Sequence, residues 1–108
     1  MIHKMRLVDF AFNKVKSKEK DIEIRVNDKK RKKIKIGDTI IFEHFLTKEE
    51  IKVQVVNLYK FDSFKELFSN FDNKRLGLKE NDTYKIMENF YSKEEEKQGA
   101  LAIQIKVI

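Results

Sequence analysis

A small set of charged side chains in this sequence could recognise or transform a polar ligand. Glu23 and Arg25 lie two residues apart in the alternating segment EKDIEIRV, so a β-strand would project both from one face. A carboxylate accepts hydrogen bonds and a guanidinium donates them, so the pair could read a planar polar molecule at two points. The alternative is an ordinary surface ion pair, which is worth about 0–1 kcal/mol.

Lys20 lies just before this pair and could complete a site with it. Strict alternation would place Lys20 on the opposite face, with Ile22, but the loop that enters the strand could redirect it. A lysine among apolar neighbours can have its pKa lowered by desolvation, which would make it a usable base or nucleophile. A lysine whose ammonium group reaches water is the simpler alternative.

Five consecutive cations follow the strand, at Lys29, Lys30, Arg31, Lys32 and Lys33. Residues 14–35 hold eleven cations and four acids, a net charge of +7, whereas the whole chain carries +6. Like charges in a row repel one another and add nothing to the fold, and a polyanion would relieve this repulsion and release counterions. The alternative is a solvated turn.

The chain offers few other groups for chemistry. It has no cysteine, and its two histidines, His3 and His44, lack metal-ligand spacing. The three glycines are far apart, so there is no phosphate-binding loop. We expect no metal and no cofactor. No apolar run approaches a membrane span or a signal peptide, which predicts a cytoplasmic protein.

The length and the apolar patterning predict the elements that must position these groups. With 108 residues, 41% of them hydrophobic, the chain suits one domain over residues 1–108. Period-two alternation predicts strands at 2–7, 20–26, 39–45, 50–59 and 100–108. We expect these apolar strand residues to be buried: Ile22, Ile24, Val53, Val55, Leu101, Ile103 and Ile105.

Helices are predicted between the strands. We expect one at 8–16, one that begins at Ser63 and runs through Phe71, one at 83–91, and a capped turn at Ser92. No regular crossover helices separate the strands, so we do not expect a doubly wound parallel sheet. The expected class is α+β or mainly β: a small pseudo-barrel of about five mostly antiparallel strands with two to four short helices.

The segments VKSKEKDIEIR and DKKRKKIKIGDTIIF together resemble the ASCH domain family of the PUA-like superfamily. Lys20, Glu23, Arg25, Gly37 and Asp38 match the family pattern in order and spacing. The later segments YKFDSFKELF and YSKEEEKQGALAIQI also look like that family, so the resemblance covers nearly the whole chain. Lys18 stands where the family usually has glycine.

The resemblance implies a PUA-like pseudo-barrel that binds RNA or a nucleotide in a cleft. Lys20, Glu23 and Arg25 would line this cleft, and the cation run Lys29–Lys33 would lie near its rim and attract phosphate. A tyrosine could stack on a base, the candidates being Tyr59, Tyr84 and Tyr91, although each could instead belong to the core.

The resemblance also leaves open an enzyme. Some similar small bacterial proteins are amidohydrolases that act on acetylcytidine with a lysine, a threonine and a glutamate. Lys20 matches that lysine, but Glu23 occupies the position of the threonine, and no third residue can be assigned. If the protein is such a hydrolase, we expect Lys20 and Glu23 to be its catalytic residues.

Overall fold

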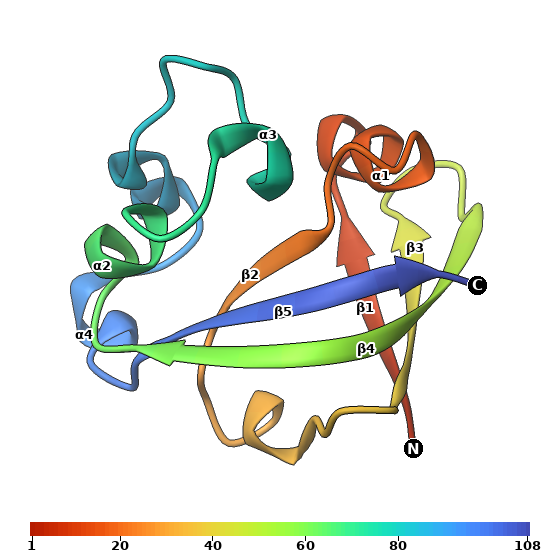
Figure 1. Ribbon diagram of the computed structural model, residues 1–108, viewed down its shortest axis with the longest axis horizontal. Helices are drawn as coiled ribbons and strands as arrows, with labels where there is room; N and C mark the ends of the chain where they lie inside the picture. The colour runs from red at the N-terminus through yellow and green to blue at the C-terminus, as the bar shows by residue number, and fades with distance from the viewer.

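A mixed five-stranded sheet forms the body of the protein, in the order β1-β3-β4-β5-β2 (Figure 1). The computed structural model describes residues 1–108. Only β1 and β3 pair in parallel, and the other neighbours are antiparallel. The strands are β1 (Ile2–Leu7), β2 (Ile22–Val26), β3 (Thr39–His44), β4 (Glu50–Phe61) and β5 (Ala100–Val107). All five lie where alternation predicts them.

The sheet curls into a half-barrel, which confirms the predicted class. The long strand β4 pairs with β3 through its first half and with β5 through most of its length, and its register shifts between Val55 and Asn57. Such an irregularity bends a strand and increases its twist. Because β1 and β2 are the two edges of this sheet, the barrel has an open seam between them.

The helices are short, and most of them gather in one lobe. Helix α1 (Asp9–Lys16) leads from β1 to β2, and the 3-10 turn η1 (Arg31–Lys33) lies between β2 and β3. The connection from β4 to β5 forms the helical lobe (Figure 1). Its elements are α2 (Phe64–Phe68), α3 (Asn73–Leu76), the 3-10 helix η2 (Tyr84–Asn89) and α4 (Lys93–Glu96).

Sequence patterning is less accurate for these helices than for the strands. The helix from Ser63 ends at Phe68, short of Phe71, and the segment predicted at 83–91 is a 3-10 helix. Neither α3 nor η1 was expected. Both serine caps are present: Ser63 accepts from the Glu66 N–H, and Ser92 forms a reciprocal capping box with Glu95. None of these helices has the length and apolar character that crossing a bilayer requires.

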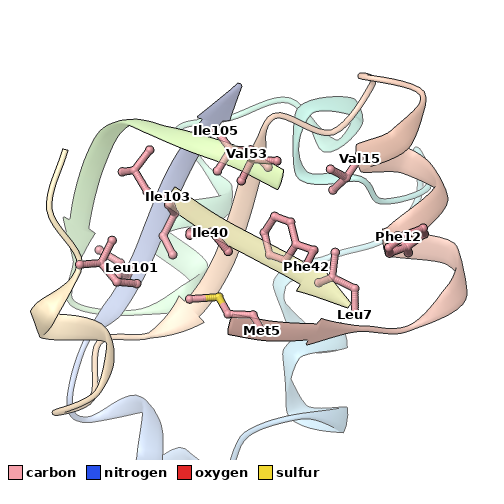
Figure 2. Close-up of a cluster of buried hydrophobic side chains, with 12 residues drawn as sticks. Met5, Leu7, Phe12, Val15, Ile40, Phe42, Val53, Leu101, Ile103 and Ile105 are labelled. Atoms are coloured by element: carbon pink, nitrogen blue, oxygen red, sulfur yellow. The ribbon is translucent and has the colours of Figure 1, made fainter. Parts of the chain in front are cut away.

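Two hydrophobic clusters lie on opposite faces of the sheet. Figure 2 shows the first, inside the half-barrel, where side chains from the strands meet Phe12 and Val15 of α1. The second lies beneath the helical lobe and includes Ile22, Ile24 and the small residues of β5. Strand β5 serves both clusters, because its alternate residues face the two sides. All the predicted core residues are buried.

Asp38 holds the start of β1 against the turn before β3. Its Oδ2 lies 2.8 Å from His3 Nε2 and accepts from the Lys35 N–H at 3.0 Å. These hydrogen bonds, with a smaller contribution from the amino group of Met1, lower the pKa of Asp38 to about 2. The Gly-Asp motif therefore fixes an edge strand of the seam and does not line a ligand site.

We predict that Asp38 contributes stability that is lost in acid. Because the pKa of Asp38 falls from 3.8 in the unfolded chain to about 2 in the fold, its contribution is fully present above pH 3.8 and disappears as the pH falls toward 2. The difference in the free energy of unfolding between the wild type and Asp38→Asn, measured in urea, should narrow as the pH falls through this range. The exposed Asp62, which makes no ion pair, supplies the control Asp62→Asn, which removes a carboxylate without breaking such a set of hydrogen bonds.

Candidate functional site

A cavity of about 360 Å³ opens at one end of the seam. Its walls come from three places: the end of β1 with the start of α1, the loop after α3, and η2 (Figure 1). Strand β2 forms its floor. Eleven of its sixteen lining residues are hydrophobic. Its size and apolar lining are those of a small-molecule site, for which volumes of about 300–1,000 Å³ are usual.

Lys20, Glu23 and Arg25 meet at the floor of this cavity. Glu23 is only 5% exposed and lies between the two cations. Its Oε1 is 3.1 Å from Lys20 Nζ, and its Oε2 accepts from Arg25 Nε at 2.9 Å. The pair is therefore buried beside a cavity, and the alternative of an ordinary surface ion pair is wrong.

Both cations also bind backbone oxygens from other segments. Lys20 Nζ donates to the carbonyl oxygens of Ile22 at 2.6 Å and Leu76 at 2.8 Å. Arg25 Nη2 donates to the Arg6 carbonyl oxygen at 3.0 Å. The three side chains therefore tie β2 to α3 on one side and to β1 across the seam on the other.

The local chain geometry explains why these residues converge. Glu23 and Arg25 pair in register with Ile103 and Leu101 of β5, so their side chains point to the face of the sheet that lines the half-barrel. The turn before β2 is made by Lys18, whose φ of 68° is the left-handed conformation that glycine usually provides. This turn carries Lys20 around to Glu23 despite the missing glycine.

Burial and charge act against each other in this network. Burial raises the pKa of Glu23, but the charges of Lys20 and Arg25 outweigh it and hold that pKa below its ordinary value. Burial lowers the pKa of Lys20, although Glu23 opposes the shift, whereas Glu23 overcomes burial and raises the pKa of Arg25. Three oxygen atoms within 3.1 Å match the three N–H bonds of a lysine ammonium.

The network leaves some hydrogen-bonding groups available to a ligand. A carboxylate has about four acceptor sites, and Oε1 of Glu23 has one ion-pair partner, Lys20. The protein's hydrogen bonds use Nε and Nη2 of Arg25, which leaves Nη1 for a ligand or for the neighbouring Tyr91. The floor can therefore both donate and accept.

The backbone of Ile24 adds a donor and an acceptor that sequence reasoning did not identify. Hydrogen bonds from Ile105 N–H to Asp21 and from Asn27 N–H to Gly99 set the alternation of the β2–β5 ladder. The N–H and C=O of Ile24 consequently point away from β5, and no strand pairs with this edge. Ile24 also lines the cavity, between Glu23 and Arg25 in β2, and the free edge of its backbone faces the seam.

Two phenylalanines at the cavity were also missed. Phe10 of α1 is 43% exposed and Phe90, just after η2, is 56% exposed, and both line the cavity. The sequence shows that these two residues are aromatic. It does not show that they are exposed on separate walls of one cavity. Of the proposed stacking tyrosines, Tyr91 lines the cavity, Tyr59 bonds to Gln104, and Tyr84 lies outside the lining.

The cation run lies elsewhere. None of Lys29, Lys30, Arg31, Lys32 and Lys33 lines the cavity, so the expectation that they form its rim needs correction. They occupy η1 and its approach, at the other end of β2 (Figure 1). The rest of β2 and the residues after it separate the cation run from Glu23 and the cavity.

A wider hollow of about 750 Å³ lies between the end of α1 and the loop after α3. Its lining is mainly polar and contains none of the predicted site residues. The structure has no group of three or more His, Cys, Asp or Glu side chains that could hold a metal ion. The smaller cavity, with its buried charges, is therefore the candidate site.

We predict that Gly77 is needed to keep Lys20 in place. A Cβ atom on Gly77 would lie 2.5 Å from Lys20 Cδ, and the residue has a φ of +74°. Gly77→Ala should therefore lower the free energy of unfolding by about 1–2 kcal/mol for the left-handed backbone, with about 1–3 kcal/mol more for overpacking. Urea unfolding measures both.

Gly37→Ala is the matched control for this prediction. Gly37 also has a positive φ, of +94°, but its added Cβ would meet nothing within 4 Å. Gly37→Ala should lose only the part of the free energy of unfolding that comes from placing a side chain on a backbone with positive φ. Equal losses in the two variants would contradict the role of Gly77 beside Lys20.

Comparison with known proteins agrees with this architecture. The model of the ASCH domain family matches residues 5–108. The crystal structure of hypothetical protein PH0355 is 32% identical, with a TM-score of 0.86 and full coverage of both chains. The solution NMR structure of protein PF0455 from Pyrococcus furiosus is 29% identical, with a TM-score of 0.78, covering 100% of this chain and 98% of that one. No curated protein matches. The chain belongs to the ASCH domain family.

Proposed function

We propose that the protein binds single-stranded RNA or a nucleotide and holds a base in the cavity. The observation that carries this proposal is the buried Lys20–Glu23–Arg25 network at the floor of an otherwise apolar cavity. Removing three charges from water is expensive, and hydrophobic residues of similar volume are often as stable. A buried charged network at the floor of a cavity is therefore better explained by ligand recognition than by a contribution to the stability of the fold.

The groups at the floor suit the edge of a nucleobase. Oε1 of Glu23 can accept from an exocyclic amine, and Nη1 of Arg25 can donate to a ring carbonyl or a phosphate. The N–H and C=O of Ile24 offer one more donor and one more acceptor in the same place. Lys20 has no free donor, so its role is to orient Glu23.

The walls suit the faces of a base. Phe10 and Phe90 are large, partly exposed aromatic groups on separate walls of the cavity. Single-stranded RNA is usually read by splaying a base out onto aromatic side chains and bonding its edges. ASCH domains are PUA-like and generally bind RNA, which supports this assignment for the present chain.

We predict that Phe90→Ala weakens nucleotide binding without affecting the fold. Stacking of one base on one aromatic ring contributes about 1–3 kcal/mol, so affinity should fall about 5- to 150-fold. Titration calorimetry with the four nucleoside 5′-monophosphates, and anisotropy of a labelled RNA octamer that contains all four bases, would measure this loss. The thermal midpoint should stay close to that of the wild type because Phe90 is mainly exposed.

Phe45→Ala is the control for this experiment. Phe45 is 47% exposed, similar to Phe90, but it stacks on His44 and lies outside the cavity. Its removal should leave binding unchanged, and equal binding by both variants would contradict the proposal. Substitution of Glu23 is a poorer test, because breaking a buried ion pair costs about 3–5 kcal/mol of stability.

An amidohydrolase acting on an acylated nucleoside is the second candidate, and one observation favours it. Burial lowers the pKa of Lys20, which lies in the lining of the cavity beside a carboxylate. A neutral lysine could act as a base or nucleophile. Against this role, the three oxygen atoms around Nζ hold the group as an ammonium ion with no free lone pair.

We therefore predict binding without hydrolysis of N4-acetylcytidine. Chromatography would detect released cytidine after prolonged incubation with stoichiometric protein. Cytidine formation by the wild type that is absent in Lys20→Met, while the variant remains folded by circular dichroism, would establish the enzyme in place of the binding protein. Phe45→Ala, which leaves the cavity intact, is the control against a contaminating hydrolase. If the protein is the enzyme, this variant, prepared in the same way, should form cytidine as the wild type does.

A further inference from the structure

The open seam of the half-barrel continues beyond the cavity to a second, smaller hollow of about 210 Å³. Consecutive residues of β1 line the two in turn: Ile2 to Met5 line the second hollow, and Arg6 and Leu7 line the cavity. On the other edge, β2 lines the cavity and the turn at η1 lines the second hollow. The two openings are therefore the two ends of one seam.

The second hollow is basic, and we refer to it as the basic hollow. Its lining includes Lys4 of β1 and Lys30 and Arg31 of the cation run. Lys30 is exposed and makes no ion pair, while Lys4 pairs only with Glu50 at the surface, at 3.4 Å. The lining contains no acidic side chain. Of these three cations, Lys30 is the one that the protein leaves without an acidic partner.

Arg31 gives a second indication that an anion belongs here. One of its terminal nitrogens, Nη1, pairs with Asp28 at 3.1 Å. Its other terminal nitrogen, Nη2, makes no hydrogen bond within the protein and is not among the buried atoms. An accessible, unpaired guanidinium nitrogen beside a basic hollow can donate to a ligand oxygen. A phosphate group has the charge and the acceptors for this contact.

We infer that the basic hollow is a phosphate subsite for the same RNA strand whose base occupies the cavity, with the strand lying along the edge of β1. The inference rests on the proposed function of the cavity. The centres of the two β1 segments are about three residues apart, which is about 10 Å along a strand. At about 3.4 Å per nucleotide, the spacing of a fully stacked strand, this distance takes at most about three nucleotides, and a strand with a splayed base covers it with fewer.

This arrangement assigns separate tasks to the two ends of the seam. The cavity reads the edge of one base, and the basic hollow holds a phosphate up to about three nucleotides away, whatever its sequence. A mononucleotide can fill only the cavity, whereas a strand of about four nucleotides can reach both. Affinity should consequently rise with length up to about four nucleotides, and longer strands should gain much less.

The test compares the double variant Lys4→Gln/Lys30→Gln with the wild type. Both lysines are exposed, so the fold should be retained. Loss of two phosphate contacts should reduce the slope of log affinity against log salt by about 1.4 for the RNA octamer. Raising salt from 50 to 200 mM should then cost the wild type about sevenfold more affinity than the variant. Binding of the four nucleoside 5′-monophosphates should be unchanged.

The double variant Lys52→Gln/Lys106→Gln is the matched control. It removes the same charge from exposed lysines of β4 and β5 that line neither opening, and it should behave as the wild type. An equal loss of slope in both double variants, or no loss in either, would overturn the basic hollow as a subsite.

The two proposals fail in different ways. Mononucleotide binding that requires Phe90, together with octamer binding that ignores Lys4 and Lys30, would overturn the subsite and leave the cavity assignment standing. A wild type that binds neither the mononucleotides nor the octamer would overturn the cavity assignment, and the subsite with it.

Discussion

The carboxylate of Glu23, buried between two cations, is the interaction on which the architecture of the site depends. Lys20 also donates to the backbone oxygens of Ile22 and of Leu76 at the end of α3, and Arg25 donates to the backbone oxygen of Arg6 on β1. The same three side chains thus neutralise one another in part and join three segments that are far apart in the sequence. Loss of the carboxylate would leave two buried cations without their counter-ion, which is the costly way to break such a network. The floor of the cavity is rigid for this reason, and rigid donors and acceptors favour selective recognition.

The incomplete closure of the barrel is what gives this network access to a ligand. A closed sheet would pair the edges of β1 and β2 with each other and leave no room between them. Here the edges are bridged at one point by Arg25, and no strand pairing joins them elsewhere. Edge strands with free N–H and C=O groups must be covered or used. In this protein α1 and the helical lobe cover one end, and between them they form the cavity.

The separation of the cavity from the cation run changes how the charge of this protein is understood. Net charge of +6 favours polyanions in general, but the structure distributes that charge over two places with different chemistry. The cavity holds a few fixed, mutually satisfied charges that suit a specific contact. The run at η1 holds exposed lysines that suit a contact with any phosphate. A strand of RNA along the seam would use both, and this division is common in nucleic-acid recognition.

The sequence by itself determined the strands, the pairing of Glu23 with Arg25 and the family, because each depends on a local pattern. Alternation has a period of two in any strand, and residues two apart share a face wherever that strand is placed. It did not determine α3, η1 or the end of α2, since helices this short are not stable alone and form only where packing supports them. Only the tertiary structure decided that the polar face of β2 looks into the half-barrel and not toward solvent. Tertiary structure also brought Phe10, Phe90 and the unpaired backbone of Ile24 to one cavity, because they come from segments whose proximity no local pattern encodes.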